Sequence, residues 1–451
     1  MARVLPFVGT RYNPKVEEDL GKVVAPPYDV IDEELQDALY ELSPHNIVRL
    51  ILGKEEVDDD EYKNKYQRAA STLKEWKNSG VLMDDPCKNF YIYQQEYMTP
   101  DKKKHVRTGF FAAIKVEDPN KGRILGHEHT FEGPKEDRLK LLRATSCNLS
   151  PIFCLYSDPE KATDAILASV TEKEPPRMEL TTADKIVHRL WLVSNINKVR
   201  QLSELLQKND FCIADGHHRY ETSVRYCREQ NQMHGKRKGE HPAYTYTLAY
   251  LTNMEAEGLQ ILPTHRVISS ELGEDVDQEE IITDLEEYFD LTPVKVDMKK
   301  AATEGPRLMK KLESMGESGT AFVMILPGGK GFYLQLKKDA DITEELPESM
   351  DEDIAKLDVS ILHQYIISQV WVGNPEIELD DQDVFYVKNA EDAIKMLGAP
   401  VKASAVFLMN APKIEQVNTI STKRLRMPHK TTFFYPKLLT GMVLRDLSAP
   451  W

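Results

Sequence analysis

Hydrophobic and polar positions follow two different periods along this chain, which indicates a mixture of strands and helices. Residues 89–97 and 107–117 alternate like a pair of strands, and residues 58–78 carry apolar side chains at the spacing of a helical face. The short apolar run at 151–156 reads as a buried strand. Because strands and helices continue to alternate, the pattern predicts an α/β or α+β fold with mixed sheets rather than one regular doubly wound sheet.

The pattern changes past about residue 270, where a second α/β unit is predicted over residues 271–451. No run of about 18 apolar residues occurs in the chain, so no membrane span is expected. The N-terminus also lacks the apolar run of a signal peptide. These features predict a cytoplasmic protein without a membrane partner.

Charge and cysteine content narrow the classes of function. The 451 residues include 58 basic and 73 acidic side chains, a formal charge of −15. A nucleic-acid partner is therefore not expected, since phosphate backbones require a basic surface, but a local basic pocket can still bind a small polyanion. The five cysteines lack CxxC spacing, which argues against a disulfide framework or a cysteine–zinc site and fits a reducing cytoplasm.

The most informative stretch is the run Asp215-Gly216-His217-His218-Arg219, which follows an apolar strand and precedes a helical pattern. A strand that turns through glycine into a helix leaves free backbone N–H groups and the positive end of the helix dipole at the turn. Such a turn binds anions, and the side chains add a metal ligand (Asp215), two titratable histidines and a permanent cation. The run predicts phosphate handling, although ordinary helix capping by Asp215 is the alternative.

The run Asp-Gly-His-His-Arg-Tyr after a strand resembles the signature of the ParB-like fold as free L-serine kinases use it. Four more segments resemble a large prokaryotic family known as a domain of unknown function: residues 25–31, 43–50, 148–153 and 427–437. The resemblance implies a ParB-like catalytic core over residues 1–270 with an insertion near 55–120. It also implies that residues 271–451 form a C-terminal α/β subdomain that contributes a basic segment to the site. The implied reaction is phosphorylation of free L-serine with pyrophosphate or a nucleotide such as ADP.

A serine hydroxyl needs a base to accept its proton, and the charged segment after His127 offers two candidates, Glu128 and Glu132. We expect Glu128 to be the base, with Asp215, His217 and His218 as the other catalytic residues. Lys135, Arg138 and Arg143 in the same segment are candidate phosphate ligands together with Gly216 and Arg219. The alternative is a charged surface loop followed by a solvated helix.

A basic excess near the C-terminus of an acidic chain suggests a second group of phosphate ligands: Lys430, Thr431, Thr432 and Lys437. We expect this segment to fold back toward the central turn and bind the far phosphate of the donor. The alternative is a basic loop that pairs with acidic surface elsewhere. Mg²⁺, held by Asp215, is the expected cofactor, because phosphoryl transfer requires neutralisation of negative charge.

The remaining candidates are assigned to substrate binding: His45, Asn46, Asn148 and His265. The expected partners are serine and pyrophosphate or a nucleotide, and the expected assembly is a monomer or homodimer. Two other functions stay open. One is a metal-dependent phosphohydrolase with histidines such as His127 and His129 as ligands, and the other is a ParB-like nucleotide-binding regulatory protein. No Walker or protein-kinase glycine loop is present, so those two mechanisms are excluded.

Overall fold

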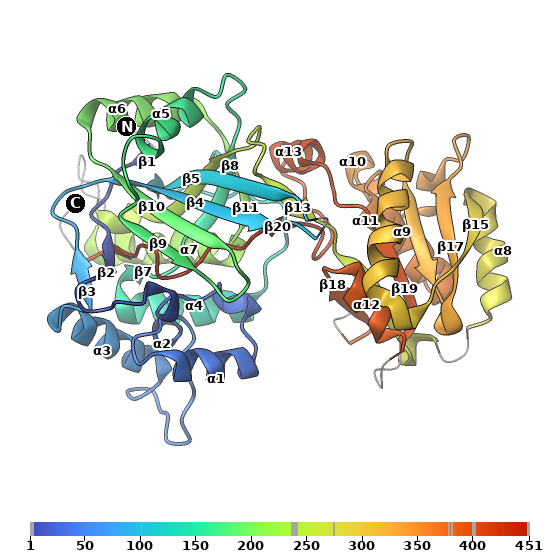
Figure 1. Cartoon of the computed structure of the whole chain (residues 1–451), viewed down its shortest axis with the longest axis horizontal. Helices are drawn as coiled ribbons and strands as arrows, with labels where there is room; N and C mark the ends of the chain where they lie inside the picture. Colours follow the sequence, from blue (N-terminus) through green and yellow to red (C-terminus); the bar gives the residue numbers. More distant parts are fainter. Residues whose placement is uncertain are drawn as a thin grey trace. The chain divides into compact units, whose positions relative to one another are not determined.

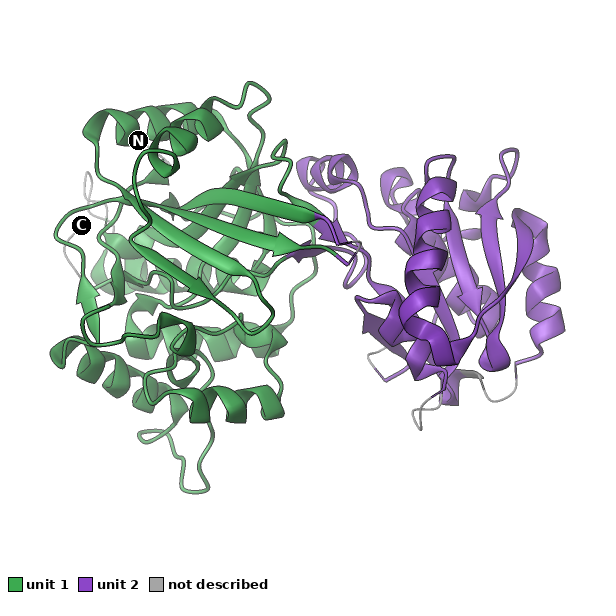
Figure 2. Ribbon diagram, in the orientation of Figure 1, with its two compact units in different colours: residues 1–99, 104–260, 436–451 green, residues 100–103, 261–435 purple. Residues whose placement is uncertain are grey.

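The structure is a computed structural model, and it describes residues 4–100, 102–235, 242–273, 276–377, 379, 382–398 and 403–448. The chain divides into two compact units, coloured separately in Figure 2: unit 1 comprises residues 1–99, 104–260 and 436–451, and unit 2 comprises residues 100–103 and 261–435. The predicted boundary near residue 270 therefore falls at residue 260. The expectation of one continuous C-terminal subdomain is corrected, because residues 436–451 belong to unit 1. None of the helices in the described ranges has the length and hydropathy that a membrane span requires.

Unit 1 is built on a mixed sheet, with nine strands in the described residues (Figure 1). In order across the sheet these are β6 (Ile124–Leu125), β11 (Phe211–Asp215), β8 (Ile152–Tyr156), β12 (Tyr246–Asn253), β5 (Lys104–Lys115), β4 (Phe90–Met98), β10 (Val187–Val193) and β9 (Met178–Thr181), with β1 (Val4–Leu5) beside β5. The sheet is mixed because β8 runs parallel to β12 and antiparallel to β11. Strands β4 and β5 lie inside the sheet, so the segment expected as an insertion near 55–120 supplies central strands of unit 1 instead.

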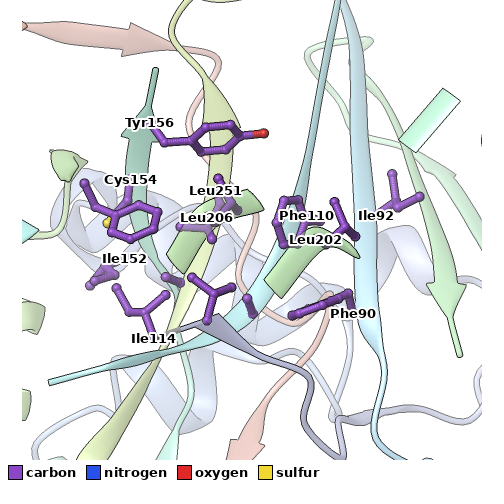
Figure 3. Close-up of a cluster of buried hydrophobic side chains, with 14 of the residues drawn as sticks. Phe90, Ile92, Phe110, Ile114, Ile152, Cys154, Tyr156, Leu202, Leu206 and Leu251 are labelled. Atoms are coloured by element: carbon purple, nitrogen blue, oxygen red, sulfur yellow. The ribbon is translucent and has the colours of Figure 1, made fainter. Parts of the chain in front are cut away.

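One face of this sheet is covered by α5 (Ala162–Thr171) and α6 (Ile196–Leu205), which lie together in Figure 1. Leu167 of α5 and Leu202 of α6 are buried with Phe110 and Ile152 of the strands, and part of this cluster is drawn in Figure 3. Alternate residues of β4 and β5 supply this face, as expected from the period of two in their sequence. Burial of each large apolar side chain contributes roughly 1.5–3 kcal/mol to folding.

The C-terminal segment of the chain contacts residues of the central strands in unit 1. The backbone oxygen of Lys437 accepts a hydrogen bond from Gln95 Nε2 at 3.0 Å, and the backbone oxygen of Pro436 accepts one from the buried Arg107. The backbone N–H of Leu439 donates to the hydroxyl of Tyr93 at 3.4 Å. These contacts fix the C-terminal segment in unit 1 and so place Lys437 there.

Four other helices of unit 1 lie away from α5 and α6 in Figure 1: α1 (Glu33–Leu42), α2 (Val48–Ile51), α3 (Lys65–Asn78) and α4 (Glu132–Thr145). Helix α7 (His217–His234) contributes Tyr220 and Val224 to the same buried cluster as Leu167 and Leu202. Asn64 caps α3 by accepting hydrogen bonds from the N–H groups of Tyr66 and Gln67. Small strand pairs complete the unit: β2 (Thr10–Tyr12) with β3 (Leu82–Asp84), and β7 (Cys147–Asn148) with β21 (Arg445–Asp446). Two 3₁₀-helices, η1 (Leu20–Lys22) and η2 (Tyr28–Val30), lie before α1 in the chain.

Unit 2 contains a second sheet, which is antiparallel throughout its described strands. Its order is β15 (Phe289–Lys295), β17 (Lys330–Leu336), β16 (Ala321–Ile325), β19 (Ala403–Met409), β14 (His265–Ser269) and β18 (Val384–Val387). The helices are α8 (Gln278–Tyr288), α9 (Ala301–Gly316), α10 (Glu352–Ala355), α11 (Asp358–Ser360), the π-helix η9 (Ile361–Trp371), α12 (Ala390–Met396) and α13 (Ile414–Thr422). Helices α9 and α12 pack on β16 and β19 through apolar side chains such as Leu308 and Ile394. A short pair, β13 (Gln260–Leu262) with β20 (Phe433–Tyr435), completes the described strands.

Candidate functional site

The candidate site is built on the turn between β11 and α7 in unit 1. A register shift between β11 and β8 places Asp215 opposite Phe153 and ends the regular strand pairing. Gly216 then has φ of +92°, a conformation that glycine adopts without strain. A Cβ atom at this position would lie 3.0 Å from Cζ of Arg219, so the turn also requires the absence of a side chain.

Helix α7 begins at His217, inside the run that was expected to precede the helix. The side chains of His217, His218 and Arg219 therefore occupy the first turn of a helix rather than a loop before it. The helix holds these three side chains in fixed positions next to the end of β11.

Asp215 is held between two cations. One carboxylate oxygen forms an ion pair with Nη2 of Arg219 and the other with Nζ of Lys437. Burial by itself would raise the pKa of Asp215, but the charges of Lys437 and Arg219 lower it below its ordinary value. Arg219 also donates to the backbone oxygen of Pro151. Two cations therefore meet at one carboxylate, and both are groups with which an anionic ligand can pair.

Both motif histidines accept hydrogen bonds from the backbone of the loop that precedes α4. Nε2 of His217 accepts from the N–H of His127 at 3.2 Å, and Nε2 of His218 accepts from the N–H of Phe131 at 3.0 Å. A ring nitrogen that accepts from an amide carries no proton, so each ring is protonated on Nδ1. Burial and the neighbouring His217 lower the pKa of His218, which agrees with a neutral ring.

This loop brings Glu128 to the turn. Oε2 of Glu128 lies 3.0 Å from Nδ1 of His217, although the angle falls short of a well-aligned hydrogen bond. The loop is fixed further by Thr130, whose hydroxyl donates to Glu221 of α7 at 2.7 Å. Two segments separated by about ninety residues in the sequence, as predicted, therefore meet in one site.

The environment of Glu128 keeps its carboxylate ionised. Burial alone would raise the pKa of Glu128, but the contact with His217 and the charge of Lys437 lower it below its ordinary value. The side chain remains 29% exposed, so a ligand can reach it. The charge of Glu128 in turn acts to raise the pKa of Asp215, which shows that the two carboxylates share one electrostatic environment.

A family model described as "Protein of unknown function (DUF1015)" matches residues 4–360 of the chain. The chain belongs to this family. Among curated proteins, none matches the chain.

Several solved structures are similar to this DUF1015 protein. A conserved hypothetical protein from Pyrococcus furiosus has 15% identity, with 76% of this chain and 97% of that chain covered and a TM-score of 0.32. A free serine kinase in complex with AMP has 14% identity, with 72% and 86% covered and a TM-score of 0.30. SbnI from Staphylococcus aureus, with a C-terminal truncation, has 10% identity, with 73% and 85% covered and a TM-score of 0.31.

The three candidate phosphate ligands on α4 have contacts that differ from one another. Lys135 lies 3.3 Å from Glu221 and 2.6 Å from Glu132, so it joins α4 to α7 at the edge of the site. Arg138 is buried, with its guanidinium 4.0 Å from the ring centre of Tyr28. Arg143 forms an ion pair with Glu229 at 2.8 Å, toward the C-terminal end of α7 and away from the turn.

Three of the candidate substrate ligands in unit 1 make structural contacts. His45 forms an ion pair with Glu17, and its ring packs edge-on against Trp76. Asn46 is fully buried, and its amide nitrogen donates to the backbone oxygens of Lys22 and Val24. Asn148 accepts through Oδ1 from the N–H of Leu248 and from Arg445.

The other candidates belong to unit 2, where each has contacts of its own. His265, expected to bind substrate, is buried in β14, and its Nδ1 accepts from the N–H of Met409 at 3.3 Å. Lys430 lies 4.4 Å above the ring centre of Tyr386. Thr431 and Thr432 are buried, and the hydroxyl of Thr431 donates to the backbone oxygen of Pro428 at 2.6 Å. Of the C-terminal basic segment, Lys437 is the residue that reaches Asp215.

The segment of Tyr28 and Asp29, part of the family-like segment 25–31, lies near the motif helix. Burial acts to lower the pKa of Arg219, but the charges of Asp215 and then Asp29 raise it. Burial raises the pKa of Tyr28, and the charges of Arg219 and Arg138 act to lower it.

Proposed function

We propose that this DUF1015 protein is a small-molecule kinase that converts free L-serine to O-phospho-L-serine, with pyrophosphate or a nucleotide as donor. The observation that carries the proposal is the approach of an ionised, accessible carboxylate, Glu128, to the first turn of the motif helix at His217. The same turn holds Asp215 between Lys437 and Arg219. A base and cations that can stabilise a transferring phosphoryl group are two elements that phosphoryl transfer to a hydroxyl requires.

Glu128 is the base in this proposal. Its carboxylate accepts the proton of the serine hydroxyl as the serine oxygen attacks the terminal phosphorus of the donor. The new bond joins the serine oxygen to phosphorus, and the bridging phosphorus–oxygen bond of the donor breaks. The electron pair leaves with orthophosphate, when pyrophosphate is the donor, or with the shortened nucleotide.

Lys437, Arg219 and the backbone N–H groups at the start of α7 stabilise the negative charge on the transferring group. The histidines have a different role from the one expected, because their Nε2 atoms already accept hydrogen bonds from the loop. His217 and His218 therefore hold the loop that carries Glu128 against α7, and they affect the reaction by fixing the position of Glu128. They are positioning residues rather than phosphate ligands.

Mg²⁺ fits the ligands that the site offers. Asp215 and Glu128 supply hard carboxylate oxygens, and each oxygen of Asp215 keeps a second lone pair beyond its ion pair. When bound, Mg²⁺ would neutralise charge on the donor phosphates and orient them. Mg²⁺ sites need one or two carboxylates with waters and phosphate oxygens, which matches this pair.

The two alternative functions find less support in the site. A histidine-ligated hydrolase would need ring nitrogens for metal, but Nε2 of His217 and of His218 are occupied by the backbone. Over the described ranges, no group of three or more metal-ligating side chains comes together. A regulatory protein bound to DNA conflicts with the formal charge of −15. For the fold, we infer a ParB-like core in unit 1 from the order strand, Asp-Gly-His-His-Arg turn and helix.

The proposal is tested by incubation of the full chain with L-serine and Mg²⁺ against pyrophosphate, ADP and ATP in parallel. We expect O-phospho-L-serine, detected by ³¹P NMR and mass spectrometry, with at least one donor and none without protein. No phosphoserine with any donor would refute the kinase. Release of orthophosphate from phosphate esters in the absence of serine would favour the hydrolase.

A further inference from the structure

A cavity of about 60 Å³ lies next to Arg219 in unit 1. Its lining includes Tyr28, Arg138, Asn148 and Arg219. A water molecule needs roughly 10–15 Å³ of cavity volume, so the cavity has room for several waters or for a small polar group such as a carboxylate.

Two guanidinium groups border the cavity, and neither uses all of its donors. Counted over the described residues, Arg219 uses two of its five N–H groups, for Asp215 and Pro151, and Arg138 uses three, for Asp137 and Ile51. Each guanidinium therefore keeps N–H groups for a ligand. The hydroxyls in the lining can donate or accept, so the two permanent cations decide the preference, which is for an anion.

Two more polar atoms are available at the cavity. Among the described residues, neither the hydroxyl of Tyr28 nor the amide nitrogen of Asn148 has a hydrogen-bond partner, since the amide oxygen takes both contacts of that side chain. The ring of Tyr28 lies under the guanidinium of Arg138, which holds the phenol in place. The hydroxyl lies where the charges of both arginines act on its pKa.

We propose that this cavity binds the carboxylate of the acceptor amino acid. Arg219 borders the cavity and also pairs with Asp215, so an anion held here lies beside the reaction centre. The cavity has room for a carboxylate. The identity of the amino acid rests on the proposed function, whereas the anion site itself rests on the lining.

Binding of L-serine, L-serinamide and inorganic phosphate to the full chain, measured by calorimetry, tests this proposal. Serinamide lacks the carboxylate and should bind at least about tenfold more weakly than serine, as for a lost hydrogen bond to a charged group. Tyr28→Phe keeps the ring under Arg138 and removes the hydroxyl, so it should weaken serine about tenfold and leave serinamide unchanged. Arg138→Gln should weaken serine further.

Matched controls come from the same unit. Tyr40→Phe alters a tyrosine whose ring also lies under an arginine, with Arg49 at 4.3 Å, and Arg225→Gln alters an arginine on the exposed face of α7. Both controls should bind serine like the wild type. Equal affinity for serine and serinamide, or an equal loss in Tyr40→Phe, would overturn the proposal. If Tyr28→Phe weakens the binding of inorganic phosphate but not of serine, the cavity binds phosphate, and the carboxylate proposal is also overturned.

The outcome separates this site from the proposed kinase reaction. If serine binds in a Tyr28-dependent way but no donor yields phosphoserine, the kinase fails and the carboxylate site stands. If phosphoserine forms and the KM for serine in Tyr28→Phe equals that of the wild type, the site fails and the kinase stands.

Discussion

Lys437 forms an ion pair with Asp215, a residue 222 positions earlier in the chain. The contact is possible because the chain returns to unit 1 after residue 435 and passes along β4 and β5. Asp215 therefore receives its second cation from the C-terminal segment, and the charge at the motif turn depends on that return. Asp215 and Lys437 are both largely buried, so little solvent screens their interaction.

Replacement of Lys437 should affect the donor more than serine. In Lys437→Met, Asp215 keeps Arg219 but loses the other cation, so the turn loses positive charge. We expect the KM for the donor to rise at least about tenfold and the KM for serine to stay within about twofold. Lys77→Met, which alters a lysine between Asp84 and Asp446, is the control for general loss of stability. If the KM for the donor and the KM for serine rise equally, Lys437 has no specific role in donor binding.

The two glycines that flank α7 offer a test of the turn. Gly216 and Gly235 both have positive φ, but a Cβ atom added at Gly216 would contact Arg219, whereas one added at Gly235 would have nothing within 4 Å. Each Gly→Ala change should destabilise the protein by roughly 1–2 kcal/mol through backbone strain. Gly216→Ala should in addition displace Arg219 and lower kcat/KM by at least about tenfold, while Gly235→Ala keeps it. Similar kinetics for the two variants would show that the position of Arg219 is not critical.

The hydrogen bonds of the loop predict the tautomer of His217. Nitrogen-15 NMR should show a protonated Nδ1 and an unprotonated Nε2 at neutral pH. His217→Gln places an amide oxygen near the position of Nε2, where it can accept from the N–H of His127, so it should keep more activity than His217→Asn, whose shorter amide lies near Nδ1. An imidazolium signal for His217, or the opposite order of the two variants, would contradict the positioning role.

His188 makes unit 1 sensitive to acid. Burial, and then the charge of Arg107, lower the pKa of His188 from 6.5 to about 3, and its ring nitrogens contact Tyr93 and Thr182. Between these values the unfolded chain binds a proton that the native state does not. The contribution of His188 to stability is therefore fully present above pH 6.5 and falls by about 1.4 kcal/mol per pH unit below it.

His188→Gln should reduce this slope by that amount when urea unfolding is followed between about pH 4 and about pH 6. His234→Gln, at the exposed end of α7, should leave the slope unchanged. Equal slopes for wild type and His188→Gln would mean that His188 takes up its proton in the native state.

The local parts of the site can be predicted well from the sequence. The strand and the Gly216 turn follow from neighbouring residues, although α7 begins at His217, inside the run that was expected to precede the helix. Glu128 stands out because a serine hydroxyl needs a base. The burial of a residue is harder to predict from the sequence where it depends on which strands lie beside its own strand. His265 sits in a polar run yet is buried, because β14 lies between β18 and β19.

Long-range pairing also explains what local patterns do not show. The sequence predicted an insertion near residues 55–120, but this segment supplies β4 and β5, which lie inside the sheet. The basic residues at 430–437 look like one segment, yet Lys430 belongs to unit 2 and Lys437 to unit 1. No local pattern marks the point at which a chain passes from one compact unit to another.

The most direct measurement is the rate of phosphoserine formation by wild type, Glu128→Gln and Glu132→Gln, each at saturating serine and donor. Gln keeps the shape of Glu128 and removes the base, so turnover should fall by about two to four powers of ten. Glu132 is highly exposed and pairs with Lys135, so Glu132→Gln should retain near-normal turnover. Near-normal turnover in Glu128→Gln, or a larger loss in Glu132→Gln, would contradict the assignment of Glu128 as the base of a serine kinase.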